Sequence, residues 1–180
     1  MILETARLLL RPVEADDIGS FFAIYGDPQT NLFNPRGPLK DMTAAQEKLS
    51  GWLQEWSDHG FGHWAIALNH KPDEIIGFGG LGIREGYENH RVFLGYRFAT
   101  AAWGKGLATE FATAVLNTGF EKLGIPQISA TVRENHLASQ HVLEKIGMQK
   151  TGFEGDPVHG IGSYLYRQTS QYVVNGSTFD

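Results

Sequence analysis

The sequence contains no cysteine among its 180 residues. Disulfide frameworks, cysteine-based zinc sites and thiol nucleophiles are therefore excluded. No apolar run approaches the roughly 18 residues that a membrane-spanning helix needs. Basic residues are also not in excess: the chain has 15 lysines and arginines and 20 aspartates and glutamates, which gives a formal net charge of −5. We therefore expect neither a membrane span nor a basic surface for nucleic acid.

A secretory signal is not expected either. A glutamate stands at position 4, and no basic segment precedes an apolar stretch, so we expect a cytoplasmic protein. The length favours a single domain over residues 1–180, which can bury a sizeable core without a metal or disulfide. Glycine is more abundant than usual, because it occupies 22 of the 180 positions, whereas the average share in proteins is about 7%. This excess indicates tight turns and close backbone approaches.

Hydrophobic spacing predicts alternating strands and helices in an α/β arrangement. The predicted strands cover residues 7–12, 63–68, 75–83, 91–99, 128–132, 148–153 and 163–174. The predicted helices cover residues 14–25, 43–56, 107–123 and 139–146. We expect Thr43 to cap the second helix, with Gln46 completing a capping box. Residues 72–74 (Pro-Asp-Glu) are expected to form the turn between the second and third strands.

The segment Trp103-Gly104-Lys105-Gly106-Leu107-Ala108 joins a predicted strand to a predicted helix. Its two glycines free the backbone, and the first helix amides have no internal partner, so the segment is a candidate cradle for phosphate. An ordinary glycine turn before a helix is the alternative. The segment is neither a P-loop nor a dinucleotide fingerprint, because no Ser or Thr follows Lys105 and Thr109 stands where a third glycine would fall.

Two stretches, Leu94–Ala99 and Trp103–Glu110, resemble the acetyl-CoA motif of the GNAT N-acetyltransferase superfamily, in its RimJ/RimL-type branch. That motif reads Gln/Arg-x-x-Gly-x-Gly/Ala, and Trp103, Gly106 and Ala108 stand at its defined positions. Other stretches resemble the branch in the same order along the chain: residues 4–12, 62–66, 76–81 and 135–148. The resemblance therefore covers nearly the whole chain.

The resemblance implies a fold and a cofactor. The fold is an α/β (α+β) domain with a mixed, mostly antiparallel sheet of about six to seven strands and about four helices. Its fourth and fifth strands, here roughly 91–99 and 128–132, splay apart to admit acetyl-CoA. The implied cofactor-binding residues are Tyr96, Arg97, Phe98, Trp103, Gly104, Lys105, Gly106, Leu107, Ala108, Thr109 and Asn135. Lys105 either touches a CoA phosphate or is an ordinary solvated lysine.

The reaction implied by the resemblance is direct attack of a neutral primary amine on the thioester. Ser139 matches the branch's serine that serves the leaving thiolate, and the alternative is a helix N-cap. Asn135 matches the cofactor-contacting asparagine, and the alternative is a turn residue. The family commonly places that asparagine three residues before the serine, whereas the spacing here is four. Either Asn135 or His136 is therefore expected to face the cofactor.

The general base is not identified by any motif. Tyrosine is absent between residues 133 and 150, so the tyrosine that some relatives place there is missing. Glu85, Glu88 and Glu154 are carboxylates that either border the acceptor side or are solvated surface charges. No metal is expected, because His59 and His63 are separated by glycines and have no third ligand nearby. Trp52 and Trp56, at helical spacing, are expected in the core or in a cleft wall.

These observations predict an acetyl-CoA-dependent N-acetyltransferase acting on a primary amine, either a protein N-terminus or a small molecule. A non-catalytic acyl-CoA-binding sensor or scaffold, and a transferase for a different acyl group, are the alternatives. No nucleic-acid or membrane partner is expected. The sequence leaves the oligomeric state open, and a homodimer is compatible with it.

Overall fold

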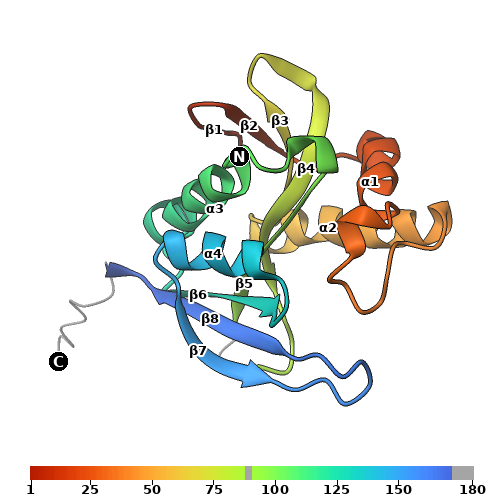
Figure 1. The fold of residues 1–180 in the computed structure, drawn as a ribbon. Helices are drawn as coiled ribbons and strands as arrows, with labels where there is room; N and C mark the ends of the chain where they lie inside the picture. The colour runs from red at the N-terminus through yellow and green to blue at the C-terminus, as the bar shows by residue number, and fades with distance from the viewer. Residues whose placement is uncertain (88–90, 172–180) are drawn as a thin grey trace.

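The computed structural model describes residues 1–87 and 91–171, which form one eight-stranded sheet with helices on both faces (Figure 1). The strands are β1 (Leu3–Glu4), β2 (Leu8–Pro12), β3 (His63–Leu68), β4 (Lys71–Ile83), β5 (Val92–Phe98), β6 (Gln127–Arg133), β7 (Gln149–Glu154) and β8 (Ser163–Thr169). The α-helices of the described residues are α1 (Ile18–Tyr25), α2 (Met42–His59), α3 (Leu107–Asn117) and α4 (Leu137–Lys145). The predicted mixed, mostly antiparallel sheet is confirmed. The sheet has one strand more than expected because β1 is only two residues long and gives no sequence pattern.

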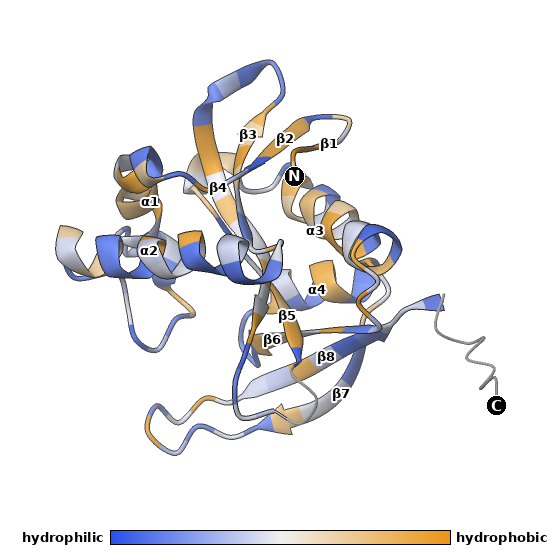
Figure 2. Cartoon of the chain, turned by 180° about the vertical axis from the view of Figure 1, so that it is seen from behind, coloured by the Kyte–Doolittle hydropathy of each residue, from blue (hydrophilic) through white to orange (hydrophobic). Residues whose placement is uncertain are grey.

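The two faces of the sheet pack against different helices. The strand order is β1-β2-β3-β4-β5-β6-β8-β7, and β5 and β6 are its parallel neighbours. Trp64 and Ile66 of β3 join the core under α3, whereas Ala65 between them joins the smaller core under α1 and α2. This alternation follows from the two-residue period of a strand. Figure 2 shows hydrophobic residues concentrated on β2, β3 and β4, while β8 is mostly hydrophilic.

The sheet opens between β5 and β6. These strands pair only at Val92 with Ile128 and at Phe93 with Ser129. Beyond these pairs β5 continues along β4, and β6 continues along β8. The β6-facing edge of β5 is therefore unpaired from Leu94 to Phe98. The predicted splay between the strands near 91–99 and 128–132 is confirmed.

The hairpin between β3 and β4 differs from the prediction. Its turn lies at Asn69 and His70, and residues 72–74 belong to β4. The ladder resumes at Ile75 opposite Ala67 after a register shift, so the residues expected to form the turn bulge out of the strand pair instead. Proline is tolerated there because a bulge needs no ladder hydrogen bond from its nitrogen.

The start of α2 also differs from the prediction. Its N-cap is Asp41, whose Oδ1 accepts a hydrogen bond from the Ala44 N–H at 2.9 Å. Thr43 lies inside the first turn, so the expected capping box with Gln46 is wrong. A carboxylate at the N-cap satisfies a free amide and also interacts favourably with the helix dipole, which explains why Asp41 takes the position.

Parts of two sequence predictions lie outside the described residues. The last strand, expected over 163–174, ends at Thr169 as β8, and residues 172–174 are not described. Glu88 is also among the residues that are not described. Within residues 1–87 and 91–171, no helix is both long and apolar enough to span a membrane.

Candidate active site

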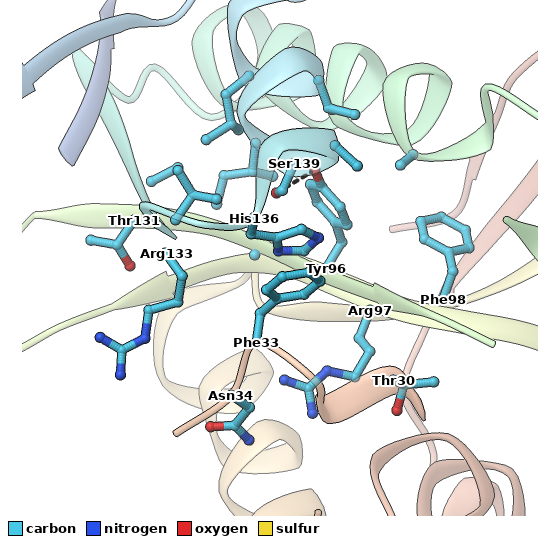
Figure 3. A pocket seen from close by; sticks show the side chains of 18 of the residues that line it. Thr30, Phe33, Asn34, Tyr96, Arg97, Phe98, Thr131, Arg133, His136 and Ser139 are labelled. Carbon is cyan, nitrogen blue, oxygen red and sulfur yellow. Dashed lines mark hydrogen bonds between the residues drawn. The ribbon is translucent and has the colours of Figure 1, made fainter. Parts of the chain in front are cut away.

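A cavity of about 1080 Å³ lies where β5 and β6 separate. Its walls come from the unpaired part of β5, from β6, from the first turns of α3 and α4, and from α2 with the segment before it. Figure 3 shows side chains from both sides of the sheet pointing into this space. The cavity therefore joins the two faces of the molecule.

The glycine segment before α3 forms one end of the cavity. Gly104 and Gly106 have φ angles of 74° and 75°, a left-handed conformation that side chains other than glycine rarely adopt. Gly106 is the N-cap of α3, and no side chain caps this helix end. The N–H groups of Leu107, Ala108 and Thr109 therefore remain available to an anion, and the helix dipole favours negative charge there.

Arg7, close to the N-terminus of the chain, forms hydrogen bonds with this end of α3. Its guanidinium donates to Glu110 Oε1 and to the Lys105 carbonyl oxygen, both at 2.8 Å. Burial alone would raise the pKa of Glu110, but hydrogen bonds from Thr5 and Arg7 outweigh it and lower that pKa. Arg7 thus neutralises a carboxylate in the first turn and adds positive charge close to Gly106. The sequence analysis missed Arg7, because no local pattern links it to a helix about 100 residues away.

The other residues of the glycine segment differ in whether they line the cavity. Trp103 and Gly104 line the cavity, whereas Lys105 is exposed and is absent from its lining. Trp103 Nε1 donates to the Phe98 carbonyl oxygen at 3.0 Å, which ties the loop to the end of β5. Lys105 contributes its carbonyl to Arg7, and its side chain is solvated.

Ser139 lies beside the side chain of Tyr96, with the two hydroxyl oxygens 3.1 Å apart (Figure 3). Because α4 begins at Leu137 with His136 as its N-cap, Ser139 is the third residue of the helix and the N-cap alternative is wrong. Burial raises the pKa of Tyr96, and the hydrogen bond with Ser139 offsets part of that rise. Tyr96 therefore stays protonated near neutral pH, and the pair can donate a hydrogen bond into the cavity. Only the backbone of Tyr96 was expected at the site.

Asn135 and His136 both line the cavity, in the loop between β6 and α4. His136 stacks on Phe33, with ring centroids 4.0 Å apart and planes 6° apart. Burial and then the charge of Arg97 lower the pKa of His136, so the ring is neutral near pH 7. Asn135 is exposed. Which of the two residues faces the cofactor stays a prediction.

The opposite end of the cavity is built on α2. Lys48, Trp52 and Glu55 are spaced by four and three residues, which places them on one helix face, and all three line the cavity. Trp52 stacks on His63 with centroids 3.8 Å apart, and His63 Nδ1 lies 2.8 Å from Glu55 Oε2. Trp52 is thus both core and cleft wall, as the sequence predicted.

Glu55 is the carboxylate that the sequence analysis missed. Among the described residues it is the acidic side chain that lines the cavity. Glu85 is exposed, and Glu154 accepts a hydrogen bond from the Tyr87 hydroxyl, and neither lines the cavity. The signal available in the sequence was the helical spacing of Lys48, Trp52 and Glu55, but it does not show that this face meets β3.

Two further residues named from the sequence have structural roles. Trp56 packs edge-on against Trp64, and its Nε1 donates to the His63 carbonyl oxygen. His59 lies against Phe61. Within the described ranges, no group of three or more acidic or histidine side chains is arranged for a metal ion.

This sheet places an open strand edge and an uncapped, glycine-flanked helix end in one cavity, an arrangement suited to an extended anionic ligand. The sequence model described as the acetyltransferase (GNAT) domain matches residues 7–149, and the chain belongs to this family. It is therefore an acyltransferase, and enzymes of this family use acetyl-CoA.

Individual relatives are distant. The uncharacterized N-acetyltransferase p20 of Bacillus licheniformis is 28% identical over 154 residues, which cover 86% of this chain and 85% of that protein. The ribosomal protein uS5 alanine N-acetyltransferase of Escherichia coli is 25% identical over 160 residues, covering 86% and 81% of the two chains. The structure of Mycobacterium smegmatis RimJ in complex with CoA-disulfide has a TM-score of 0.75 at 23% identity, covering 93% of this chain and 84% of that one. The last comparison shows the same fold.

Proposed function

We propose that this protein is a RimJ/RimL-type N-acetyltransferase, in which the whole chain forms one catalytic domain that acetylates a primary amine with acetyl-CoA. One observation carries the proposal: a single cavity connects the free amides of α3, the Tyr96–Ser139 pair and the Glu55–His63 pair. Cofactor binding, thiolate stabilisation and deprotonation of the amine each need one of these elements.

The cofactor end would use backbone groups. The amides from Gly104 to Thr109 would bind the pyrophosphate, and the free edge of β5 at Tyr96, Arg97 and Phe98 would pair with the pantetheine amides. The Phe98 carbonyl already accepts from Trp103, so one of its two lone pairs is used. Asn135 or His136 would complete the cofactor contacts at the start of α4.

The reacting groups would meet between the two ends. The amine nitrogen attacks the thioester carbonyl carbon, and the carbon–sulfur bond then breaks. The Tyr96–Ser139 pair would donate a hydrogen bond to the departing thiolate, with Ser139 as the catalytic residue. When His63 donates through Nδ1 to Glu55, its Nε2 is the basic atom that would accept the proton of the ammonium, directly or through water.

The experiment measures thiol release from acetyl-CoA over a panel of primary amines that includes protein N-terminal peptides and small amines. Thiol release coupled to one acetylated amine is expected. Tight acetyl-CoA binding without release across the panel would favour the sensor or scaffold, and faster release from propionyl-CoA would favour another acyl group. Glu55→Gln should lower kcat/KM by about 100-fold or more, because His63 loses the carboxylate that lies beside its Nδ1.

A further inference from the structure

The end of the cavity built on α2, which we call the acceptor end, holds two positive charges that make no ion pair with an acidic side chain of the described residues. Lys48 lies at the rim with its Nζ 5.2 Å from the centre of the Tyr25 ring, and the Arg97 guanidinium lies 4.5 Å from the same centre. Tyr25 is buried, and burial raises its pKa to about 12, so it supplies no negative charge. Two cations thus converge on one neutral aromatic ring.

Neither cation has an ion-pair partner in the part of the chain that the structure describes. The guanidinium of Arg97 donates to the side-chain oxygen of Asn31, a neutral acceptor, and Lys48 has no hydrogen-bond partner among the described residues. Desolvation, followed by the charges of Arg97 and Arg36, lowers the pKa of Lys48. In a chain of net charge −5, this concentration of unpaired positive charge is not a consequence of composition.

The other two arginines that line the cavity contact different groups. Arg133 pairs with Asp156 at 2.9 Å, whereas Arg84 donates to the Thr131 hydroxyl and lies over the Phe93 ring. Lys48 and Arg97 differ from both, because they converge on one neutral ring without a carboxylate. Two cations without a carboxylate at a cavity wall are suited to bind an anion from outside the chain.

The face of α2 that lines the cavity carries a positive side chain, Lys48, at one end and a negative one, Glu55, at the other. Lys48 and Glu55 are seven residues apart, which corresponds to about 10 Å along the helix axis, and Trp52 lies between them. One end of this face is cationic, and the other end holds the Glu55–His63 pair proposed to take the proton of the amine. The arrangement is complementary to a molecule that carries an amine at one end and an anionic group at the other.

The segment after η2 (Gln29–Asn31) limits the size of that molecule. Phe33 of this segment stacks across the cavity on His136 at the start of α4 (Figure 3). The contact joins the acceptor side to the cofactor side and narrows the space between them. This narrowing favours a small acceptor over the N-terminus of a folded protein.

We propose that the acceptor is a small amine that carries a carboxylate, bound by Lys48 and Arg97. The proposal rests on the proposed N-acetyltransferase function and names its substrate class. The carboxylate accepts hydrogen bonds from the two cations, Tyr25 and Trp52 form the apolar wall between them and the Glu55–His63 pair, and the amine lies toward that pair. Lys48 and Arg97 are then specificity-determining residues.

The test uses α-amino and ω-amino acids of increasing chain length, each matched with its carboxamide, and measures kcat/KM from thiol release. The wild type should prefer acids by at least tenfold. Lys48→Met should lower kcat/KM for acids at least tenfold, mainly through KM, while amides change little. Lys48→Arg should restore the preference, and Lys40→Met, the same charge change at an exposed lysine outside the cavity lining, should leave it intact.

The outcomes separate this proposal from the function on which it rests. Equal turnover of acids and amides, or equal losses for both in Lys48→Met, would overturn the carboxylate site and leave the N-acetyltransferase standing. Turnover of N-terminal peptides without turnover of any free amino acid would overturn the small acceptor. If no amine releases thiol, the transferase proposal fails, and calorimetry of the CoA-loaded protein decides the site: binding of acids but not amides supports it, and absence of binding overturns it.

Discussion

At the scale of single residues, the contact between Tyr96 and Ser139 changes what a mutation at Ser139 tests. Ser139 is not a helix cap, so its hydroxyl is not used at the helix end and pairs instead with the Tyr96 hydroxyl at the cavity. Ser139→Ala should lower kcat by about 10- to 1,000-fold with little change in acetyl-CoA affinity, because a donor to the leaving thiolate acts mainly in the transition state. Steady-state kinetics and calorimetry on one preparation measure both quantities.

The controls address structural effects. Ser139→Ala also removes the partner of the Tyr96 hydroxyl, at a cost of about 1 kcal/mol in the free energy of unfolding. Ser50→Ala, at an exposed position of α2, controls for the substitution itself. If the pair acts as a unit, Tyr96→Phe combined with Ser139→Ala should lose no more rate than the worse single variant. An unchanged kcat in Ser139→Ala would remove this serine from the mechanism.

Gly106 gives the second prediction at this scale. Gly106→Glu should weaken acetyl-CoA binding at least tenfold, about 1.4 kcal/mol, because it places a carboxylate where phosphate is expected. The left-handed φ of 75° also makes any side chain there strained, by about 1–2 kcal/mol. Gly124→Glu, at an exposed glycine with φ of 64°, controls for that strain. Calorimetric affinity that falls equally in both variants would contradict the phosphate assignment.

At the scale of elements, β5 carries different functions on its two sides. Tyr96 contacts Ser139 and Phe111 on the face of α3 and α4, whereas Arg97 lies over Tyr25 of α1 on the other face. Gly95 lies on the same side of the strand as Arg97, because side chains alternate along a strand. A Cβ at Gly95 would meet no atom within 4 Å. The glycine thus keeps the acceptor side of the strand open.

The empty space beside Gly95 gives a third prediction. Gly95→Val should fill the space beside Arg97 and lower kcat/KM for the acceptor at least tenfold, while the backbone edge that faces the cofactor keeps its acetyl-CoA affinity. The melting temperature should stay level or rise, since valine suits a strand better than glycine. Gly152→Val in β7, where a Cβ makes only ordinary contacts with Leu165, is the matched control. Normal acceptor kinetics in Gly95→Val would place the acceptor elsewhere.

The boundaries of two helices show the limit of local sequence patterns. The start of α3 was predictable, because Gly106 and the apolar positions that follow mark it in one short segment. The start of α4 was not, because His136 is an uncommon N-cap and Ser139, a common one, lies three residues further on. For α2, the sequence analysis chose Thr43, whereas Asp41, two residues earlier, is the cap; both residue types are favoured at N-caps, so residue type alone does not decide between them.

At the scale of the whole molecule, the mixed, mostly antiparallel sheet and its splay were predictable from the resemblance, whereas the side chains that meet across the cavity were not. Glu55 and His63 belong to a helix and to the strand after it, and Tyr96 and Ser139 are 43 residues apart. Which helix face meets which strand depends on the packing of the complete core. A sequence pattern identifies each side chain but not its partner.

The contact between Arg7 and Glu110 joins residues 103 positions apart in the sequence, further than either of these pairs, and it gives the last prediction. Glu110 accepts hydrogen bonds from the Thr5 hydroxyl at 2.6 Å and from the backbone and side chain of Arg7 at 2.9 and 2.8 Å, which fastens the start of β2 to the first turn of α3. These bonds lower the pKa of Glu110 below its ordinary value of 4.5 despite partial burial. A carboxyl group whose pKa falls on folding stabilises the folded state above its unfolded pKa and loses that contribution as pH falls through the folded pKa. Glu110→Gln should therefore reduce the free energy of unfolding at pH 7 by up to about 1 kcal/mol, since the pair is partly solvated.

Urea unfolding across a pH series measures this effect. The deficit of Glu110→Gln relative to the wild type should stay constant from pH 7 down to the ordinary carboxyl range and shrink at lower pH, where the wild-type carboxylate is also protonated. Glu47→Gln, at an exposed carboxylate of α2, is the matched control and should change the free energy of unfolding little. Because Arg7 would lose its partner next to Gly106, acetyl-CoA affinity should change in Glu110→Gln and not in Glu47→Gln. A deficit that persists unchanged into the acid range would mean that Glu110 contributes through its shape and not through its charge.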